Sequence, residues 1–388
     1  MLTKSIKIKN FAKSKVKVSL KLKIKKILSD DSELLKSLSR SYEDKYKIKS
    51  IKKIIGKNKI RLIGMGGSIL GAQAIYNFLN KKVKKKFFFV NNLISKRKIS
   101  HQDKFTNLII SKSGNTLETI TNANILIKNK QKNIFITENK PSYLYNLAHK
   151  LKSEIIHHNN YIGGRYSVLS EVGMLPAELM GLNPQKFRQL DNLIKNQKFI
   201  NLLIENTSSI LNYVKEKKFN SIIINYDHSS NYLFQWYQQL VAESLGKKGK
   251  GILPVISEMP KDNHSLMQFY LDGIKKNFFT FFAYKEKSTD TDKIEKKKLF
   301  NSHKFLGSRN INEIMLGQKK ATEKVFSRKK IPYRSFEINN KDEKTLGELF
   351  CYFILETILL GRALNVNPFD EPSVDLIKKE TRKFFSYK

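Results

Sequence analysis

The chain has 388 residues, 40% of them hydrophobic, and this apolar content excludes wholesale disorder because it supplies side chains for buried cores. Its length exceeds the about 250–300 residues over which one core usually keeps growing, so we expect two domains or one domain with large additions. The formal net charge of +39 results from 73 basic and 34 acidic residues.

The positive charge is spread along the whole chain. Only ten of the 73 basic residues are arginines, whereas nucleic-acid recognition usually depends on arginine and aromatic side chains in a defined motif. We therefore expect no specific nucleic-acid partner. The positive field would still attract anionic small molecules, phosphates among them.

Residues 1–44 form a basic N-terminal extension in which apolar residues alternate with lysines. This alternation predicts one or two half-exposed strands, and it lacks the unbroken apolar core of about 7–15 residues that a secretory signal needs. No run of about 18 apolar residues predicts a membrane span. The single cysteine, Cys351, allows no disulfide within the chain and fits a reducing compartment, so we expect a soluble cytoplasmic protein.

Residues 45–185 alternate predicted strands with predicted helices, which indicates parallel β-α-β units and an α/β fold. The predicted strands cover residues 59–64, 85–92, 105–111, 133–138 and 154–158, and the predicted helices cover 68–80, 116–130 and 141–152. In such a sheet, ligands bind beyond the carboxyl ends of the strands.

Residues 186–340 contain a second α/β set. Its predicted strands cover residues 220–226, 252–257 and 277–284, and its predicted helices cover 231–246 and 263–273. The charged segment 285–298 has almost no apolar residues and predicts a loop. The last part, residues 341–388, predicts a mostly buried apolar helix at 346–365 and a basic helix at 374–385, which together pack back on the core.

Two loops follow predicted strands and precede predicted helices. GMGGS at 64–68 lacks the third glycine and the acidic residue of a dinucleotide fingerprint, so it predicts either backbone contact with a sugar or phosphate, or only a tight turn. SKSGNT at 111–116 brings hydroxyls, backbone N–H groups and a cation to a helix N-terminus, which suits an anion. An ordinary turn with a helix cap would use the same residue types.

Four side chains are candidates for chemistry. Arg165 follows two glycines and suits a developing oxyanion, or it is an ordinary surface arginine. Gln239 and Glu243 are four residues apart and share a helix face, where Glu243 is either a general base or a helix residue that pairs with a lysine. His264 could move protons near neutral pH or could simply cap or pack. The histidines and the one cysteine are scattered, so we expect no metal site.

Five stretches, taken in this order, resemble the signature of the phosphoglucose isomerase family, and the third and fourth are the most specific. They are GMGGS, SKSGNTLET, GGRYSVLSEVGMLPA (163–177), QQLVAESLGKKGKG (238–251) and NPFDEPSVDLIKK (367–379). The resemblance implies two SIS-type (sugar isomerase) three-layer αβα domains with mostly parallel sheets. It also implies reversible isomerisation of glucose 6-phosphate and fructose 6-phosphate through a cis-enediol, without cofactor or metal, in a homodimer with a shared active site.

The resemblance also implies roles for individual residues. Glu243 would move the proton between C1 and C2, and Arg165 would stabilise the intermediate. His264, contributed by the neighbouring subunit, and Lys378 would assist ring opening. The substrate-binding residues that it implies are Gly66, Gly67, Ser68, Ser111, Lys112, Ser113, Thr116, Gly164 and Gln239.

The C-terminal motif departs from the family pattern Asp-Gln-x-Gly-Val-Glu, because residues 370–375 read DEPSVD. The register of Lys378 is kept, and Lys379 is an alternative to it. A related isomerase that also accepts mannose 6-phosphate has the same motifs. A sugar-phosphate sensor would keep the phosphate loop, but it would not need Glu243, Arg165 and His264 together with a lysine.

Overall fold

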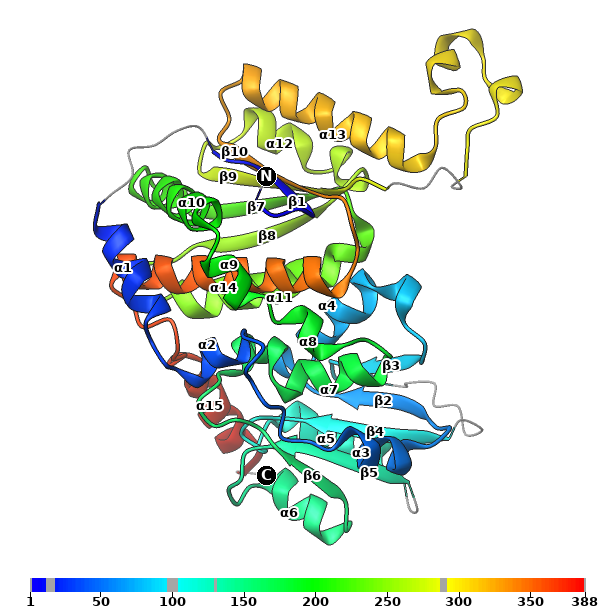
Figure 1. Cartoon of the computed structure of the whole chain (residues 1–388), viewed down its shortest axis with the longest axis vertical. Coiled ribbons are helices and arrows are strands. Elements are labelled where there is room, and N and C mark those ends of the chain that lie inside the picture. The colour runs from blue at the N-terminus through cyan, green and yellow to red at the C-terminus, as the bar shows by residue number, and fades with distance from the viewer. Residues whose placement is uncertain (1, 12–17, 96–103, 129–130, 287–291, 387–388) are drawn as a thin grey trace.

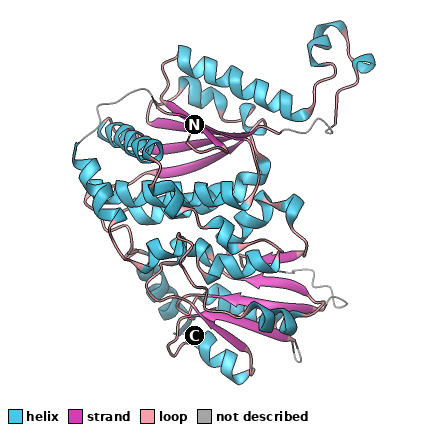
Figure 2. Cartoon of the chain, viewed as in Figure 1, coloured by secondary structure: helices cyan, strands magenta, loops and turns pink. Residues whose placement is uncertain are grey.

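The computed structural model describes residues 2–11, 18–95, 104–128, 131–286 and 292–386. It contains two five-stranded sheets that lie at opposite ends of an elongated molecule, with helices α11 (Asn231–Leu245) and α14 (Glu343–Leu364) between them (Figure 1). Helices surround both sheets (Figure 2). The predicted α/β class with mostly parallel sheets is confirmed.

The first sheet has the strand order β3-β2-β4-β5-β6, and all of its strand pairs are parallel. The chain passes from β2 to β3 on one side and then crosses to β4 on the other, so the order reverses between β2 and β4. Ligands of such sheets bind at this reversal. The five strands are β2 (Lys59–Ile63), β3 (Phe87–Val90), β4 (Phe105–Ile110), β5 (Lys132–Thr137) and β6 (Glu154–His157).

The helices in and around the first sheet are α3 (Ile48–Ile55), α4 (Leu70–Phe78), α5 (Leu117–Leu126), α6 (Tyr143–Lys150), α7 (Glu171–Leu179), α8 (Pro184–Phe187) and α9 (Leu190–Ile194). The three helices predicted in this half correspond to α4, α5 and α6 within a few residues, whereas α3, α7, α8 and α9 were not predicted. The helix predicted from residue 116 to 130 begins at Leu117 and ends at Leu126, and residues 129–130 lie outside the described part.

The second sheet has the order β1-β10-β9-β7-β8, and β1 is its antiparallel edge strand. Its strands are β1 (Ile6–Lys9), β7 (Asn220–Asn225), β8 (Leu253–Glu258), β9 (Asn277–Tyr284) and β10 (Tyr333–Ile338). The neighbouring helices are α10 (Gln197–Lys215), α12 (Met267–Asp272) and α13 (Ile311–Arg328). The predicted loop at 285–298 contains one short 3-10 turn in its described residues, and residues 287–291 lie outside them.

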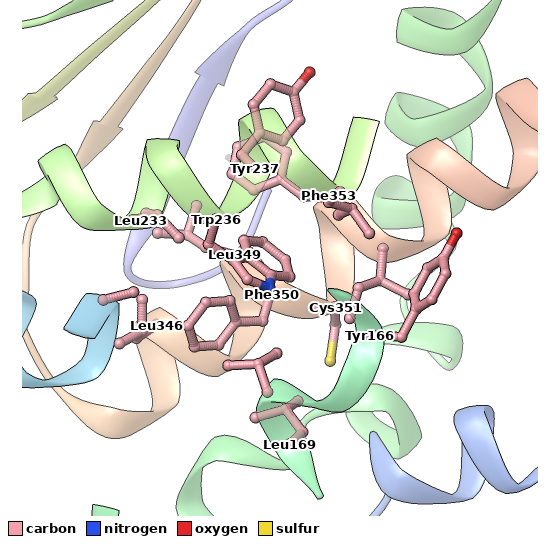
Figure 3. Packing of buried hydrophobic residues seen from close by; sticks show 14 of the residues in the cluster. Tyr166, Leu169, Leu233, Trp236, Tyr237, Leu346, Leu349, Phe350, Cys351 and Phe353 are labelled. Carbon is pink, nitrogen blue, oxygen red and sulfur yellow. The ribbon is translucent and has the colours of Figure 1, made fainter. Parts of the chain in front are cut away.

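The apolar helix predicted near the C-terminus is α14, and 18 of its 22 residues are buried. A helix that is hydrophobic on all sides needs neighbours all round, and α14 contacts α8, α10, α11 and the N-terminal helix α1 (Val18–Leu28). Trp236 of α11 meets Phe350 of α14 edge to face, with ring centroids 4.8 Å apart (Figure 3). The buried Glu356 of α14 accepts hydrogen bonds from Arg334 of β10, which compensates both charges.

The N-terminal extension corrects one prediction. The alternation predicts strands, and β1 is one, but residues 18–28 form helix α1 (Val18–Leu28), followed by α2 (Glu33–Ser37). Leu20, Ile24 and Ile27 are buried with helical spacing, whereas Leu22, which a strand would place on the same face as Leu20, is 66% exposed. Contact with α10 and α14 therefore overrides the alternation.

The final helix, α15 (Val374–Ser386), buries none of its residues. The sequence predicted that both C-terminal helices pack on the core. Helix α14 does so, whereas α15 does not. In the described part of the chain, no helix combines the length and the hydrophobicity that crossing a bilayer requires.

Candidate active site

The first glycine loop follows β2 and packs directly on the backbone before Arg165. A Cβ atom on Gly67 would lie 2.2 Å from the carbonyl carbon and oxygen of Gly164 and 2.6 Å from the nitrogen of Arg165. Gly66 has a φ of +50°, and a Cβ there would lie 2.8 Å from Nε2 of Gln239. Only glycine permits these approaches. The GMGGS loop is therefore more than a simple turn, because it packs against the stretch that contains Arg165 and the stretch that contains Gln239.

The loop at 111–116 follows β4 and places two hydroxyls together at the start of α5. Oγ of the buried Ser111 lies 2.9 Å from Oγ1 of Thr116. Thr116 is the N-cap residue of α5, yet its side chain makes no capping hydrogen bond. The interpretation as an ordinary cap requires that bond, so these hydroxyls and the N–H groups of the first turn remain open to an anion. Ser113 is exposed, and its Oγ accepts a hydrogen bond from Asn115 N.

Lys112 of the same loop is directed toward other partners. Its Nζ donates to the carbonyl oxygen of Asn160 at 2.9 Å and lies 3.6 Å from Oε1 of Glu138. The charge of Lys112 is therefore largely compensated in this structure, and the anion-binding character of the loop depends on hydroxyls and backbone N–H groups.

Arg165 is 3% exposed, which excludes the surface interpretation, and each of its five N–H groups has a partner. Nε donates to Ser244 Oγ at 2.9 Å, and Nη2 donates to the carbonyl oxygens of Pro368 and Asp370 at 2.9 and 3.0 Å. Nη1 donates to two carboxylates, Glu243 at 3.3 Å and Glu371 at 2.7 Å.

The pKa of Arg165 is raised, because its anionic partners outweigh the opposing effect of burial. The Glu371 hydrogen bond is the main contribution that raises it, and the carboxylate charges of Glu243 and Glu371 add to it. Arg165 is thus a permanent, immobilised cation at the centre of the site.

Glu243 lies near the C-terminal end of α11, and its side chain is 25% exposed. Its Oε2 accepts from Arg165 Nη1 and, at 3.3 Å, from Gln239 Nε2, as the spacing of four residues predicts. Its Oε1 makes no hydrogen bond to any residue that the structure describes. One oxygen is therefore held and the other is free to accept a proton, which is the arrangement that a general base requires.

The segment 365–371, which we call the C-terminal strap, covers Arg165. Lys247 holds it through the carbonyl oxygen of Asn367 and, at 2.7 Å, through Oδ1 of Asp370. Tyr166 donates to the carbonyl oxygen of Pro368 at 2.9 Å and lies 2.8 Å from Ser244 Oγ. The basic loop after α11 thus has a structural role in holding this strap.

Two predicted catalytic residues lie apart from this cluster. His264 is exposed between a 3-10 turn (Lys261–Asn263) and α12. Lys378 is exposed on α15, where its Nζ pairs with Asp375 at 2.8 Å, and Lys379 is exposed beside it. Among the described residues, no hydrogen bond or ion pair links them to Glu243 or Arg165.

A pocket of about 460 Å³ lies between α4, α11 and β8, and neither Glu243 nor Arg165 is among the residues that line it. Among the predicted site residues, Gln239 lines it, and its Oε1 is buried without a partner in the described structure. The other residues that line the pocket are Leu70, Asn231, Gln235, Gln238, Ala242, Ile256 and Glu258. Within the described residues, no group of three or more His, Cys, Asp or Glu side chains is arranged to hold a metal ion.

Sequence reasoning missed three residues that organise the site. Ser244 and Tyr166 follow Glu243 and Arg165 directly, but neither the spacing nor the residue type indicates that they bond to each other across 78 positions. Glu371 belongs to a predicted motif, yet nothing in that motif shows that it reaches Arg165. The sequence signal for close packing beside Arg165 is Gly67 in the first glycine loop, because a Cβ there would lie 2.2 Å from the carbonyl group of Gly164.

Comparison with known proteins adds independent information. The family model described as phosphoglucose isomerase matches residues 21–252. A glucose-6-phosphate isomerase from Methanocaldococcus jannaschii is 33% identical over 354 residues, which cover 87% of this chain and 85% of the relative. A glucose-6-phosphate isomerase from Mycoplasmopsis pulmonis is 31% identical, with 84% and 82% coverage.

Two solved structures show the same fold. A hypothetical protein from Thermus thermophilus has a TM-score of 0.82 at 20% identity and covers 95% of this chain and 94% of its own. A glucose-6-phosphate isomerase from Chlamydia trachomatis has a TM-score of 0.70 at 18% identity, with 92% and 73% coverage.

Proposed function

This chain belongs to the phosphoglucose isomerase family, and on that premise we propose that its site interconverts glucose 6-phosphate and fructose 6-phosphate with Glu243 as the base. The observation that carries the proposal is the pairing of Glu243 with Arg165: one carboxylate oxygen is anchored at 3.3 Å, and the other makes no hydrogen bond to a described residue. An aldose–ketose isomerase needs this combination of a poised base and a fixed cation.

The chemistry follows from these groups. Glu243 takes the proton from C2 of the open-chain aldose phosphate, the C2–H electrons form the C1–C2 double bond, and the C1 oxygen takes the negative charge of an enediolate before it gains a proton. The resulting cis-enediol becomes the ketose when the 2-hydroxyl loses its proton and C1 receives one from Glu243. Arg165 offsets the negative charge on the enediolate oxygens, and Gln239 orients the sugar.

In this proposal the phosphate group of the substrate binds away from the reacting carbons and anchors the sugar. Ser111, Ser113 and Thr116, with the first N–H groups of α5, hold the phosphate, and its binding energy orients the reacting carbons. The backbone of Gly66, Gly67 and Gly164, with Ser68 at the end of the loop, borders the sugar. The charge of Lys112 adds to this site through the general field rather than by direct contact.

The proposal assigns ring opening of the sugar to His264 and Lys378. It also takes the protein to be a cytoplasmic homodimer in which each subunit contributes His264 to the active site of the other. The exposed position of His264 supports its donation to a neighbouring subunit. Mixing Glu243→Gln chains with His264→Ala chains tests the assignment, because a mixed dimer with shared sites regains one complete site. Activity that never rises above that of the separate variants would contradict the shared site.

The proposed activity is tested with the purified full-length chain and fructose 6-phosphate, with glucose 6-phosphate detected by a coupled dehydrogenase. We expect Glu243→Gln to lower kcat by about 10²–10⁴-fold without loss of sugar-phosphate binding. Glu380→Gln on α15 removes the same charge from an exposed pair with Lys383 and is the matched control. Binding without turnover by the folded wild type would instead indicate a sugar-phosphate sensor.

A further inference from the structure

Arg165 has a second carboxylate partner that the proposed mechanism does not use. Glu371 accepts from Nη1 at 2.7 Å, which is shorter than the 3.3 Å bond from the same nitrogen to Glu243. An Nη atom carries two N–H groups, and both are occupied by these carboxylates. The remaining three N–H groups of Arg165 are directed at Ser244 and at two carbonyl oxygens of the strap.

An enediolate oxygen therefore has no vacant donor on Arg165. The bonds to Ser244 Oγ and to the carbonyl oxygen of Pro368 are buried and the bond to the carbonyl oxygen of Asp370 is part-buried, and these partners belong to α11 and the strap. Glu371 differs from them, because its side chain is 43% exposed and it is the last residue of the strap. Among these partners, it is the one that can turn into solvent without disturbing the fold.

The proposed reaction forms an enediolate anion next to Arg165. We propose that Glu371 competes with this anion for Nη1 of Arg165 and so restrains turnover. This inference rests on the proposed isomerase function. Glu371 is a positioning residue: in the resting site it neutralises Arg165 and holds Nη1, and it must yield when negative charge develops on the sugar. Four other hydrogen bonds keep Arg165 in place when it does.

The charge balance gives the direction of the effect. Glu243 becomes neutral when it takes the proton, so the enediolate faces Arg165 with Glu371 as the remaining negative neighbour. Removing a charge at about 5 Å in a partly solvated site, with an effective dielectric constant of about 40, stabilises an anion by about tenfold. Glutamine keeps an oxygen that can accept from Nη1 and removes only the charge.

The test compares wild type with Glu371→Gln and Glu371→Asp, and two probes separate charge from structure. A five-carbon aldonic acid 5-phosphate has a carboxylate that resembles the charge of the enediolate, whereas an alditol 6-phosphate has the same phosphate and no charge at the reacting end. We expect Glu371→Gln to bind the aldonate about tenfold more tightly, to bind the alditol unchanged, and to raise kcat by about three- to tenfold with an unaltered KM. Glu371→Asp, which keeps the charge, stays near wild type in the ratio of the two affinities.

The control Glu380→Gln should alter neither affinity. The inference is overturned if Glu371→Gln leaves the aldonate-to-alditol ratio at the wild-type value, or if both probes weaken together, which indicates that Glu371 only supports the strap. A wild type that binds both probes but does not isomerise fructose 6-phosphate would refute the proposed function separately, since the affinity ratio is measured without turnover.

Discussion

Replacement of Gly67 by alanine tests whether the first glycine loop positions Arg165. The added Cβ would lie 2.2 Å from two backbone atoms of Gly164, about 1.2 Å closer than the 3.4 Å at which ordinary contact begins. Backbone cannot rotate away as a side chain does, so the loop that carries Arg165 must move. Overpacking of this kind costs about 1–3 kcal/mol, and a misplacement of about 1 Å at a catalytic group lowers the rate by about 10²-fold.

The matched control lies directly across the contact. A Cβ on Gly164 would meet no atom within 4 Å, so Gly164→Ala should keep the thermal stability of the wild type. For 388 residues the unfolding entropy is about 0.8 kcal/mol/K, so Gly67→Ala should lower Tm by about 1–4 °C. Differential scanning fluorimetry and the fructose 6-phosphate assay measure both effects. An unchanged Tm with kcat within about threefold of wild type would refute the close packing of these loops.

Two further predictions concern buried ionisable side chains. Arg334→Met leaves the buried Glu356 without its cationic partner, and of the described donors only the Tyr352 hydroxyl still donates to it. This change should cost about 3–5 kcal/mol in thermal or denaturant unfolding, whereas the additional change Glu356→Leu should restore much of it. Equal losses in both variants would contradict this cause. Burial lowers the pKa of His158 from 6.5 to about 4, so the folded chain keeps it neutral and unfolding is favoured as pH falls from 6.5 toward 4, by up to about 3 kcal/mol. The pH dependence of Tm should therefore be shallower in His158→Gln over that range, and identical slopes would count against the assignment.

Features of the fold that depend on neighbouring residues in the sequence could be predicted from it. Strands of apolar residues followed by glycine or hydroxyl-rich loops and amphipathic helices indicate parallel β-α-β units wherever they occur. The spacing of four between Gln239 and Glu243 places them on one helix face in any fold, and their hydrogen bond follows. The strongly apolar segment 346–361, which only Glu348, Glu356 and Thr357 interrupt, likewise predicts a mostly buried helix, and α14 is one.

The N-terminal extension shows where such patterns fail. Apolar residues separated by single lysines fit the alternating pattern of a half-buried strand. Leu20, Ile24 and Ile27, however, also have the spacing of one buried helix face. The choice depended on what lies opposite, and α10 and α14 offer a surface for a helix. The role of Lys112 in the phosphate loop also depended on distant residues. Its ammonium group donates to the carbonyl oxygen of Asn160 and lies near the carboxylate of Glu138, and local sequence does not predict either contact.

The sequence by itself determined most strands of the two sheets, the loops at their ends and the residue types available for proton transfer, since these depend on spacing within about ten residues. Only the tertiary structure decided how they combine: that Gly67 touches Gly164, that Arg165 is buried, and that Glu243 and Glu371 share its Nη1. The two carboxylates lie 78 and 206 positions from Arg165 along the chain. Periodicity carries no information about such pairs, because they arise from the crossovers that bring separate strand ends and the C-terminal strap to one place.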